Sequence, residues 1–349
     1  MAYISFQPND YFNTKLWTGT GAENAITGVG FQPDWVWIKN RDAAEHNKLY
    51  DAVRGANKVI YSNLTNAEAT VTQDVKSFDS NGFTLGTESA VNASGQDIVG
   101  WNWKAGTSFT NDASATGIGT IDSTGSVNQD AGFSIVSYTG NATDNASVKH
   151  GLNTAPKMVI IKDLSDTSSW GVWHQNLTNG GYKLTLNSTD AQADDTSFIG
   201  GSNRAIPTSS VFFLGGGGGG NGTNANIAYC FSEVKGYSKF GSYTGNGSTD
   251  GPFVYTGFKP AFVLVKNTSA ANNWFLQDSK RLGYNGANHL QKPNTNGADD
   301  TGTHIDMLSN GFKTIVSSAN CNGSGNTMIY MAFAEAPLVS SNGVPAVAR

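Results

Sequence analysis

The sequence predicts an all-β protein built from three tandem β-sandwich modules of the jelly-roll or lectin-like type. One pattern occurs three times along the 349 residues: an aromatic residue, Thr and Gly, then a loop, Pro, a short apolar run and Lys. The chain contains 42 glycines, and only 14% of its residues are charged. Its apolar residues fall in short runs bounded by Gly, Asn, Asp and Ser, which is typical of strands separated by turns.

The repeated pattern has a constant part and a variable part. Pro and Lys are six residues apart in every copy, whereas the loop before Pro varies by one or two residues. Constant spacing within a unit and variation outside it indicate a repeated structural module. The apolar run between Pro and Lys is continuous, which favours a strand covered on both faces. The copies begin at Trp17, Tyr138 and Tyr243 and end at Lys39, Lys162 and Lys266.

Each module closes with a second apolar run. The last aromatic residue of that run (Trp103, Phe231 or Phe333) lies 70, 75 or 73 residues after the Pro of its module. Modules one and three also contain Ser-Asn-Gly-Phe, at residues 80–83 and 309–312, and Asn-Gly before an apolar residue predicts a tight hairpin turn. Six or seven short strands fit into each unit of about 100 residues, which is the size of a β-sandwich.

The module boundaries follow from changes in composition. We expect module one in residues 1–106, a Ser/Thr/Gly-rich linker in residues 107–130, module two in residues 131–236 and module three in residues 237–337. Residues 338–349 form a C-terminal tail without a pattern. Modules two and three are joined with almost no linker, which predicts a stiff junction.

Composition argues against several functional classes. The formal net charge is −5 and Lys and Arg form no block, so we expect no binding to the nucleic-acid backbone. The chain has no basic, apolar N-terminal segment and no apolar run of membrane-spanning length, so we expect neither export by a signal peptide nor membrane insertion. Cys230 and Cys321 occupy non-matching positions in two modules, which favours free thiols over a disulfide or a metal site.

The tryptophans fall into two groups. Four of them take positions where the other modules carry Met, Ile, Phe or Leu, which predicts core residues: Trp35, Trp37, Trp101 and Trp103. The other group, Trp170, Trp173 and Trp274, lies among polar residues. We interpret these three as candidates for exposed contacts with a sugar or a neighbouring subunit.

The poly-Gly run at residues 215–220 is a second candidate contact region. A phosphate-binding loop needs a helix directly after the glycines, whereas here another strand follows, so a long hairpin loop is favoured. Loops on rigid β scaffolds often carry binding residues. Gly217 and Gly218 are therefore candidate contact residues.

Two pairs of adjacent carboxylates occupy equivalent places, Asp194 and Asp195 in module two and Asp299 and Asp300 in module three. They are weak Ca²⁺ candidates, and solvated or turn-capping roles are favoured. Adjacent side chains on a strand point to opposite faces, so neither pair resembles the facing carboxylates of a glycosidase. The five histidines show no recurring spacing, and we nominate no catalytic residue and no cofactor.

One further feature occurs in modules one and three. An Asp is followed three residues later by an Arg, at residues 51 and 54 and again at residues 278 and 281. Each pair lies 12 residues beyond the Lys of its module. This spacing suggests a structural ion pair or turn lock, which contributes modestly to stability if it is exposed.

Three segments resemble a β-rich repeat found in virion proteins of bacteriophages, many of them marine. They are residues 30–39 (GFQPDWVWIK), 80–83 (SNGF) and 101–106 (WNWKAG). The resemblance extends over residues 12–336 and is clearest in module one and weakest in module two. It implies a tail-fibre, other tail-associated or virion-surface component, and it brings no catalytic residues.

We therefore expect a non-enzymatic virion structural protein that is assembled in the host cytoplasm. The favoured role is a tail-associated fibre or receptor-binding component that contacts host surface glycans or neighbouring virion subunits. A capsid decoration protein that stabilises the head is the first alternative, and a glycan-degrading depolymerase of the tailspike type is the second. We expect a homo-oligomer, with a trimer as the common arrangement of tail proteins.

Overall fold

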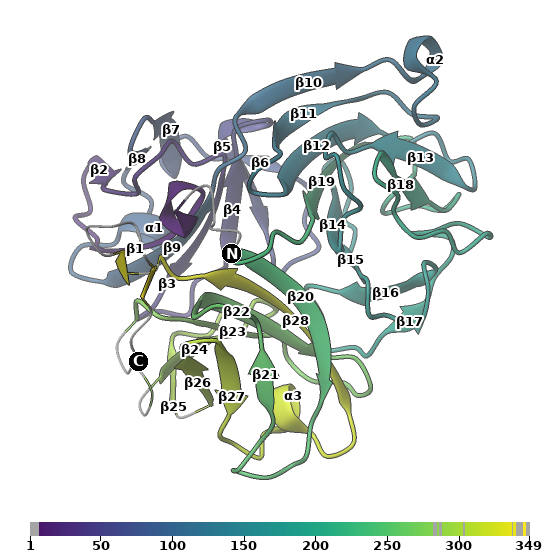
Figure 1. Cartoon of the computed structure of the whole chain (residues 1–349). Helices are drawn as coiled ribbons and strands as arrows, with labels where there is room; N and C mark the ends of the chain where they lie inside the picture. Colours follow the sequence, from purple (N-terminus) through teal and green to yellow (C-terminus); the bar gives the residue numbers. More distant parts are fainter. Residues whose placement is uncertain are drawn as a thin grey trace.

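The computed structural model describes residues 7–281, 285, 288–302, 304–336, 338–339 and 345–346. Strands pair in antiparallel sheets throughout the three modules, and the α-helices of the described part are single turns. The predicted all-β class is therefore confirmed. Figure 1 shows the modules as three lobes around a common centre, module 1 in purple to blue, module 2 in teal and module 3 in green to yellow.

Module 1 consists of a six-stranded sheet in the order β1-β9-β3-β4-β5-β6 and a three-stranded sheet in the order β2-β8-β7. Its elements are η1 (Pro8–Asp10), β1 (Phe12–Thr18), β2 (Asn24–Thr27), β3 (Trp35–Asn40), β4 (Lys48–Asp51), β5 (Gly55–Tyr61), β6 (Ala69–Thr70), β7 (Val75–Asp79), β8 (Gly82–Leu85), α1 (Ser89–Asn92) and β9 (Asp97–Trp103).

Module 2 consists of an eight-stranded sheet in the order β10-β11-β12-β19-β14-β15-β16-β17 and the pair β13-β18. Its elements are β10 (Thr107–Asn111), α2 (Ala113–Thr116), β11 (Ser123–Asn128), β12 (Phe133–Thr139), β13 (Ala146–Lys149), β14 (Met158–Asp163), β15 (Gly171–His174), β16 (Tyr182–Thr185), β17 (Ala193–Asp194), β18 (Val211–Leu214) and β19 (Ala225–Phe231).

Module 3 consists of a six-stranded sheet in the order β20-β28-β22-β23-β24-β25 and a three-stranded sheet in the order β21-β27-β26. Its elements are β20 (Ser238–Thr244), β21 (Phe253–Tyr255), β22 (Pro260–Asn267), β23 (Phe275–Asp278), β24 (Asn288–Gln291), β25 (Asp300–Gly302), β26 (Ile305–Leu308), β27 (Gly311–Thr314), α3 (Ala319–Asn322) and β28 (Thr327–Ala334). A short pair, β29 (Leu338–Val339) and β30 (Pro345–Ala346), follows; the rest of the expected tail lies outside the described residues.

The repeated pattern of the sequence is the centre of each large sheet. The Pro-to-Lys strands β3, β14 and β22 are buried along their whole length, as their continuous apolar runs predict. Each pairs with the closing apolar strand of its module, β9, β19 or β28. The Asn-Gly signals also form the predicted tight hairpins, β7-β8 and β26-β27, with two residues between the strands.

Residues 107–130 are not the linker that their composition suggested. They form β10, α2 and β11, and β11 pairs with β12, so the hairpin widens the large sheet of module 2. Most side chains of β10 are exposed because this strand lies at the edge of the sheet. Ser and Thr are therefore compatible with a paired strand here, and composition alone does not distinguish such a strand from a flexible segment.

The inward faces of the three large sheets share one hydrophobic core. This core includes buried residues from all three modules, while the small sheets of modules 1 and 3 cover separate clusters on the outer side. Trp35 of module 1 stacks on Tyr229 of module 2, with ring centroids 4.5 Å apart. Phe12 of module 1 stacks on Phe333 of module 3 at 5.2 Å, and Phe333 meets Phe231 of module 2 edge to face. The large sheets of modules 1 and 3 are buried on both faces because each lies between the shared core and its own outer cluster.

The ring of modules closes through three equivalent seams. At each seam, the backbone amide just before the last strand of one large sheet donates to the carbonyl just after the Pro-to-Lys strand of the next module. The three bonds are Glu68 to Leu164 (2.9 Å), Gln192 to Thr268 (3.1 Å) and Asp299 to Arg41 (2.7 Å). The last bond joins module 3 back to module 1, which gives the chain an approximate threefold arrangement.

Candidate binding site at the seam of modules 3 and 1

The tryptophans predicted to be exposed lie inside the protein. Trp170, Trp173 and Trp274 are only 0%, 4% and 1% exposed, so the prediction of surface contacts is wrong. The Trp170 indole N–H donates to the Tyr61 carbonyl of module 1 at 2.8 Å. The Trp274 indole N–H donates in the same way to the Thr185 carbonyl of module 2 at 2.9 Å. Two of the three rings therefore lie at the contacts between modules. Their polar sequence neighbours do not indicate that another module covers them.

The poly-Gly run is a loop between β18 and β19, but it is not the predicted hairpin loop, because β18 pairs with β13 whereas β19 pairs with β12 and β14. Gly218 is exposed, whereas the Gly217 amide donates to the Ser197 carbonyl at 2.7 Å. The Tyr138 hydroxyl donates to the Gly220 carbonyl at 2.6 Å. Most of the loop is therefore fixed against its own module, and of the two candidate contact residues Gly218 alone is freely accessible.

A buried asparagine in this loop recurs in every module and was missed by the sequence analysis. Its side-chain oxygen accepts a hydrogen bond from the amide of the residue after the repeated Thr-Gly, and its amide group donates to two loop carbonyls. The three residues are Asn92, Asn221 and Asn322. The signal was present in the sequence, because each asparagine lies just before the closing strand of its module.

The Gly of the aromatic–Thr–Gly step is required by close packing at the same place. A Cβ atom on Gly19, Gly140 or Gly245 would lie 2.1, 1.8 or 2.3 Å from a carbonyl oxygen of the loop that holds the buried asparagine. No side chain fits at these distances. The repeated motif is thus a structural requirement for docking this loop.

The repeated lysines are buried and serve the fold. Their ammonium groups donate to backbone carbonyls of the following turn, and the Lys266 ammonium also reaches the Thr189 carbonyl of module 2 at 3.1 Å. Burial lowers the pKa of each lysine to about 8, because the charged form is removed from water. The three residues are Lys39, Lys162 and Lys266.

The repeated Asp-to-Arg pairs are buried ion pairs that also link modules. Arg54 contacts Asp51 at 2.5 Å and Arg281 contacts Asp278 at 2.6 Å, all with side chains at most 3% exposed. The Tyr229 hydroxyl of module 2 donates to Asp51, and an indole N–H of module 1 donates to Asp278. The predicted ion pairs between Asp and the Arg three residues later are present. The contacts with other modules could not be predicted from the sequence spacing.

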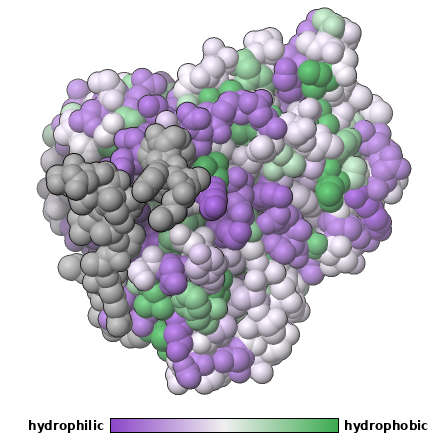
Figure 2. Space-filling model, viewed as in Figure 1, coloured by the Kyte–Doolittle hydropathy of each residue, from purple (hydrophilic) through white to green (hydrophobic). Residues whose placement is uncertain are grey.

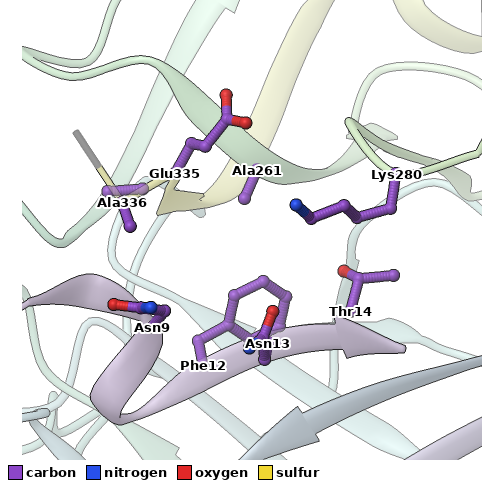
Figure 3. Close-up of a pocket in the computed structure, with 9 residues that line it drawn as sticks. Asn9, Phe12, Asn13, Thr14, Ala261, Lys280, Glu335 and Ala336 are labelled. Atoms are coloured by element: carbon purple, nitrogen blue, oxygen red, sulfur yellow. The ribbon is translucent and has the colours of Figure 1, made fainter. Parts of the chain in front are cut away.

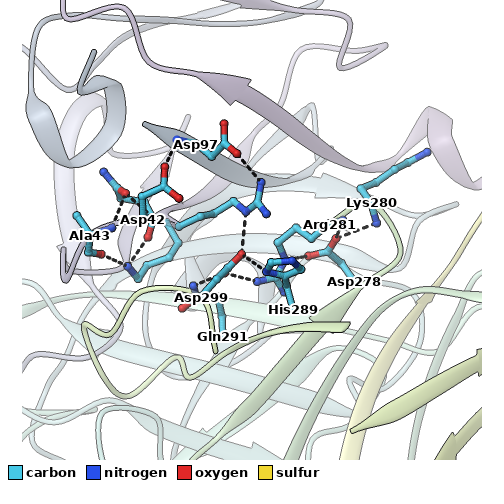
Figure 4. Close-up of polar contacts among 12 residues, drawn as sticks. Asp42, Ala43, Asp97, Asp278, Lys280, Arg281, His289, Gln291 and Asp299 are labelled. Atoms are coloured by element: carbon cyan, nitrogen blue, oxygen red, sulfur yellow. Dashed lines mark hydrogen bonds and ion pairs between the residues drawn. The ribbon is translucent and has the colours of Figure 1, made fainter. Parts of the chain in front are cut away.

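Asp299 joins modules 3 and 1 through a network of charged groups (Figure 4). Its carboxylate contacts Arg41 of module 1 and Arg281 of module 3, each at 2.8 Å, and the His289 ring nitrogen at 3.1 Å. The side chain is only 6% exposed. Burial alone would raise the pKa of Asp299, but the Arg281 and Arg41 guanidinium groups outweigh it and hold the pKa below its usual value.

The other three Ca²⁺ candidates are each paired with a cation. Asp194 contacts Arg204 at 2.6 Å, Asp195 contacts Lys183 at 2.8 Å and Asp300 contacts Lys292 at 2.9 Å. Within the described residues, no group of three or more His, Cys, Asp or Glu side chains is arranged to hold a metal ion. The structure therefore gives these aspartates ion-pairing roles.

A cavity of about 180 Å³ opens at the same seam (Figure 3). Phe12 lies at its base, and polar groups of Asn9, Asn13, Thr14, Lys280 and Glu335 line it. Thr14 is only 7% exposed, and its hydroxyl has no hydrogen-bond partner among the described residues. The ammonium of Lys280 forms no ion pair within the same part of the chain. These donors, together with the Glu335 carboxylate, suit a small ligand group that carries hydroxyl groups.

The position of the cavity reflects a difference between modules. The cavity lies beside β1, the edge strand of module 1, whereas the equivalent edge strand of module 2, β12, is covered by β11. The β10–β11 hairpin thus extends the sheet beyond β12 in module 2, whereas β1 of module 1 and β20 of module 3 remain edge strands. The seam of modules 3 and 1 is therefore our candidate binding site.

Comparison with known proteins gives one match. A family model described as "Domain of unknown function (DUF7483)" matches residues 7–337. No curated protein and no solved structure matches the chain. Among the residues that the structure describes, no helix is long and apolar enough to cross a membrane.

Proposed function

Since this chain belongs to the DUF7483 family, whose description names no activity, we propose its function from sequence and architecture. It is a non-enzymatic structural component of a bacteriophage particle, with a tail-associated fibre or receptor-binding role. It contacts host surface glycans or neighbouring virion subunits. The resemblance of residues 30–39, 80–83 and 101–106 to virion repeats is the starting point of this proposal.

The observation that carries the proposal is the closed ring of modules around one aromatic core. The polar residues that repeat from module to module all make structural hydrogen bonds or ion pairs: the lysines, the buried asparagines and the Asp-to-Arg pairs. An enzyme keeps polar groups free to act on a substrate. A scaffold uses them to fix its loops, and this distribution favours a scaffold.

A capsid decoration protein is the second candidate. It is favoured by the approximate threefold arrangement of the modules, because a threefold-like body matches threefold positions on an icosahedral shell. The same arrangement matches the end of a trimeric fibre. The two roles differ in copy number, since tails use few to tens of copies and shells use hundreds.

Quantitative mass spectrometry of purified particles, with heads and tails separated, tests the proposal. We expect the protein in the particle, enriched with the tail and present at the low copy number. Enrichment with heads at high copy number would support decoration instead. Absence from particles would reject both roles.

The depolymerase alternative has its own test. The seam role of Asp299 makes it unsuitable for substitution, so the variant replaces Asp194, Asp195 and Asp300 by alanine. The assay measures reducing ends released from host polysaccharide by the wild type and by this variant. Release by the wild type would contradict a non-enzymatic role, and loss in the variant would assign the activity to these carboxylates.

A further inference from the structure

Two aromatic rings stand out on the surface of module 3. Phe253 and Tyr255 of β21 are 47% and 64% exposed, and Ile206 is the third large hydrophobic residue exposed to this degree among the described residues. Val254, between them, is 6% exposed and belongs to the outer cluster of module 3. Because side chains alternate along a strand, both rings lie on the outward face of the small sheet. Figure 2 shows hydrophobic residues gathered over the β21–β27 region of this module.

The strand register places a specific set of groups beside the rings. Lys313 of β27 lies opposite Phe253, and Asp306 of β26 lies next to Lys313. Gly311 of β27 lies opposite Tyr255, and a Cβ there would come within 3.0 Å of the Phe253 ring. The same Cβ would lie 2.1 Å from the Val254 carbonyl oxygen, so the glycine is required mainly by the close approach of the two strands. The face is a flat aromatic surface with a charged row along one side.

The charged row supplies hydrogen-bonding groups at the edge of the rings. Lys313 forms an ion pair with Asp250, whose side chain is 86% exposed, and the Lys313 side chain is 35% exposed. Asp306 is half-buried on the neighbouring strand. Ammonium and carboxylate groups therefore lie within reach of a ligand that rests on Phe253.

This surface is absent from the other two modules. The equivalent positions are Ala25 and Thr27 on β2 of module 1, and Lys149 and the buried Ser147 on β13 of module 2. Unlike the buried asparagines, the two exposed rings are therefore not part of the fold that the three modules share. The aromatic pair therefore serves something that module 3 alone contacts.

We propose that Phe253 and Tyr255 form a stacking platform for the sugar rings of a polysaccharide. The apolar C–H face of a pyranose ring packs on an aromatic ring, and its hydroxyl groups bind the charged row. Neighbouring outward positions on a strand are about 7 Å apart, so one extended glycan chain spans both rings. A protein partner would need a broader apolar centre, on an interface of about 800 Å² per partner. The charged row favours the saccharide.

This inference rests on the proposed role at the particle surface, because it names the chemistry that such a surface contacts. The full-length chain is compared with the double variant Phe253→Ala/Tyr255→Ala and with Ile206→Ala, which removes the other exposed hydrophobic residue. Each protein is run in native affinity gels that contain dextran, alginate or purified host lipopolysaccharide. We expect retardation of the wild type by at least one polysaccharide and about tenfold weaker binding by the double variant, equivalent to about 1.4 kcal/mol.

The possible outcomes distinguish a failure of the glycan-binding inference from a failure of the proposed virion role. Equal retardation of wild type and double variant, or no retardation in any of the gels, would overturn the platform. If the gels show no retardation but the double variant no longer enters particles, the surface binds a protein and the glycan inference is wrong. Binding that depends on the two rings, in a protein absent from purified particles, would instead leave the platform standing and reject the virion role.

Discussion

Replacing Asp299 by alanine tests how the ring is closed. In the wild type, this buried carboxylate lies 2.8 Å from both Arg41 and Arg281. In the variant, Arg281 retains its ion pair with Asp278 at 2.6 Å. Among the described residues, the one carboxylate that Arg41 still contacts is Asp97, at 3.5 Å and with a side chain that is 54% exposed. Removing one partner of a buried ion pair costs about 3–5 kcal/mol. Because Arg281 retains a partner, we expect a loss of about 3 kcal/mol in the free energy of unfolding.

Urea unfolding at pH 7, followed by tryptophan fluorescence, measures this loss, because the tryptophans of the shared core become exposed on unfolding. Asp194→Ala is the matched control, since Asp194, on β17 at the edge of the large sheet of module 2, forms an exposed pair with Arg204. We expect this control to change stability only slightly. A loss for Asp299→Ala no greater than for Asp194→Ala would refute the role of the charged network in closing the ring.

The pH dependence of the same pair of proteins gives a second readout. The pKa of Asp299 is lower in the folded protein than in the unfolded chain, so the ionised carboxylate stabilises the fold. This contribution is complete above the ordinary aspartate pKa of about 4 and is lost as the pH falls through the lower folded value. We expect the stability difference between wild type and Asp299→Ala to shrink below about pH 4. A difference that stays constant from pH 7 to pH 3 would contradict the ion-pair explanation.

Three further predictions concern the repeated features. Gly140→Ala should destabilise the protein strongly, because its Cβ would lie 1.8 Å from the Gly222 carbonyl oxygen, whereas Gly218→Ala has open space and should be tolerated; thermal unfolding compares the two. The buried thiols of Cys230 and Cys321, whose pKa values burial raises, should react with a thiol reagent only after denaturation; reaction in the native protein would contradict their burial. The repeated lysines should resist an acylating reagent while exposed lysines such as Lys235 react, as mass spectrometry of labelled peptides can show. These protected residues are Lys39, Lys162 and Lys266.

The sequence was sufficient to predict the strands that repeat. Continuous apolar runs and constant spacing predicted β3, β14 and β22, and the hydrophobic replacements between copies predicted that Trp35 and Trp37 lie in the core, which is confirmed by their 0% exposure. These features are local or repeat in register, so a single chain reveals them.

The contacts between modules could not be predicted in this way. Trp170 and Asp299 looked exposed because their sequence neighbours are polar, yet each is covered by a module more than 100 residues away along the chain. Conversely, the alternation of Phe253, Val254 and Tyr255 predicts a strand with two different faces, but it does not say which face is inside. Local patterns carry no information about which surface another module covers.

The shared aromatic core has a consequence for synthesis of the protein on the ribosome. Phe12 of β1 emerges early, but its stacking partner Phe333 belongs to β28, close to the end of the described chain. Until that strand is made, the large sheet of module 3 is incomplete, and the inner faces of the first two large sheets remain partly exposed to water. An incomplete chain therefore exposes tryptophan and phenylalanine side chains as a hydrophobic surface, which binds chaperones and promotes aggregation. The aromatic side chains of the shared core are covered only after β28 has been synthesised and has folded onto them.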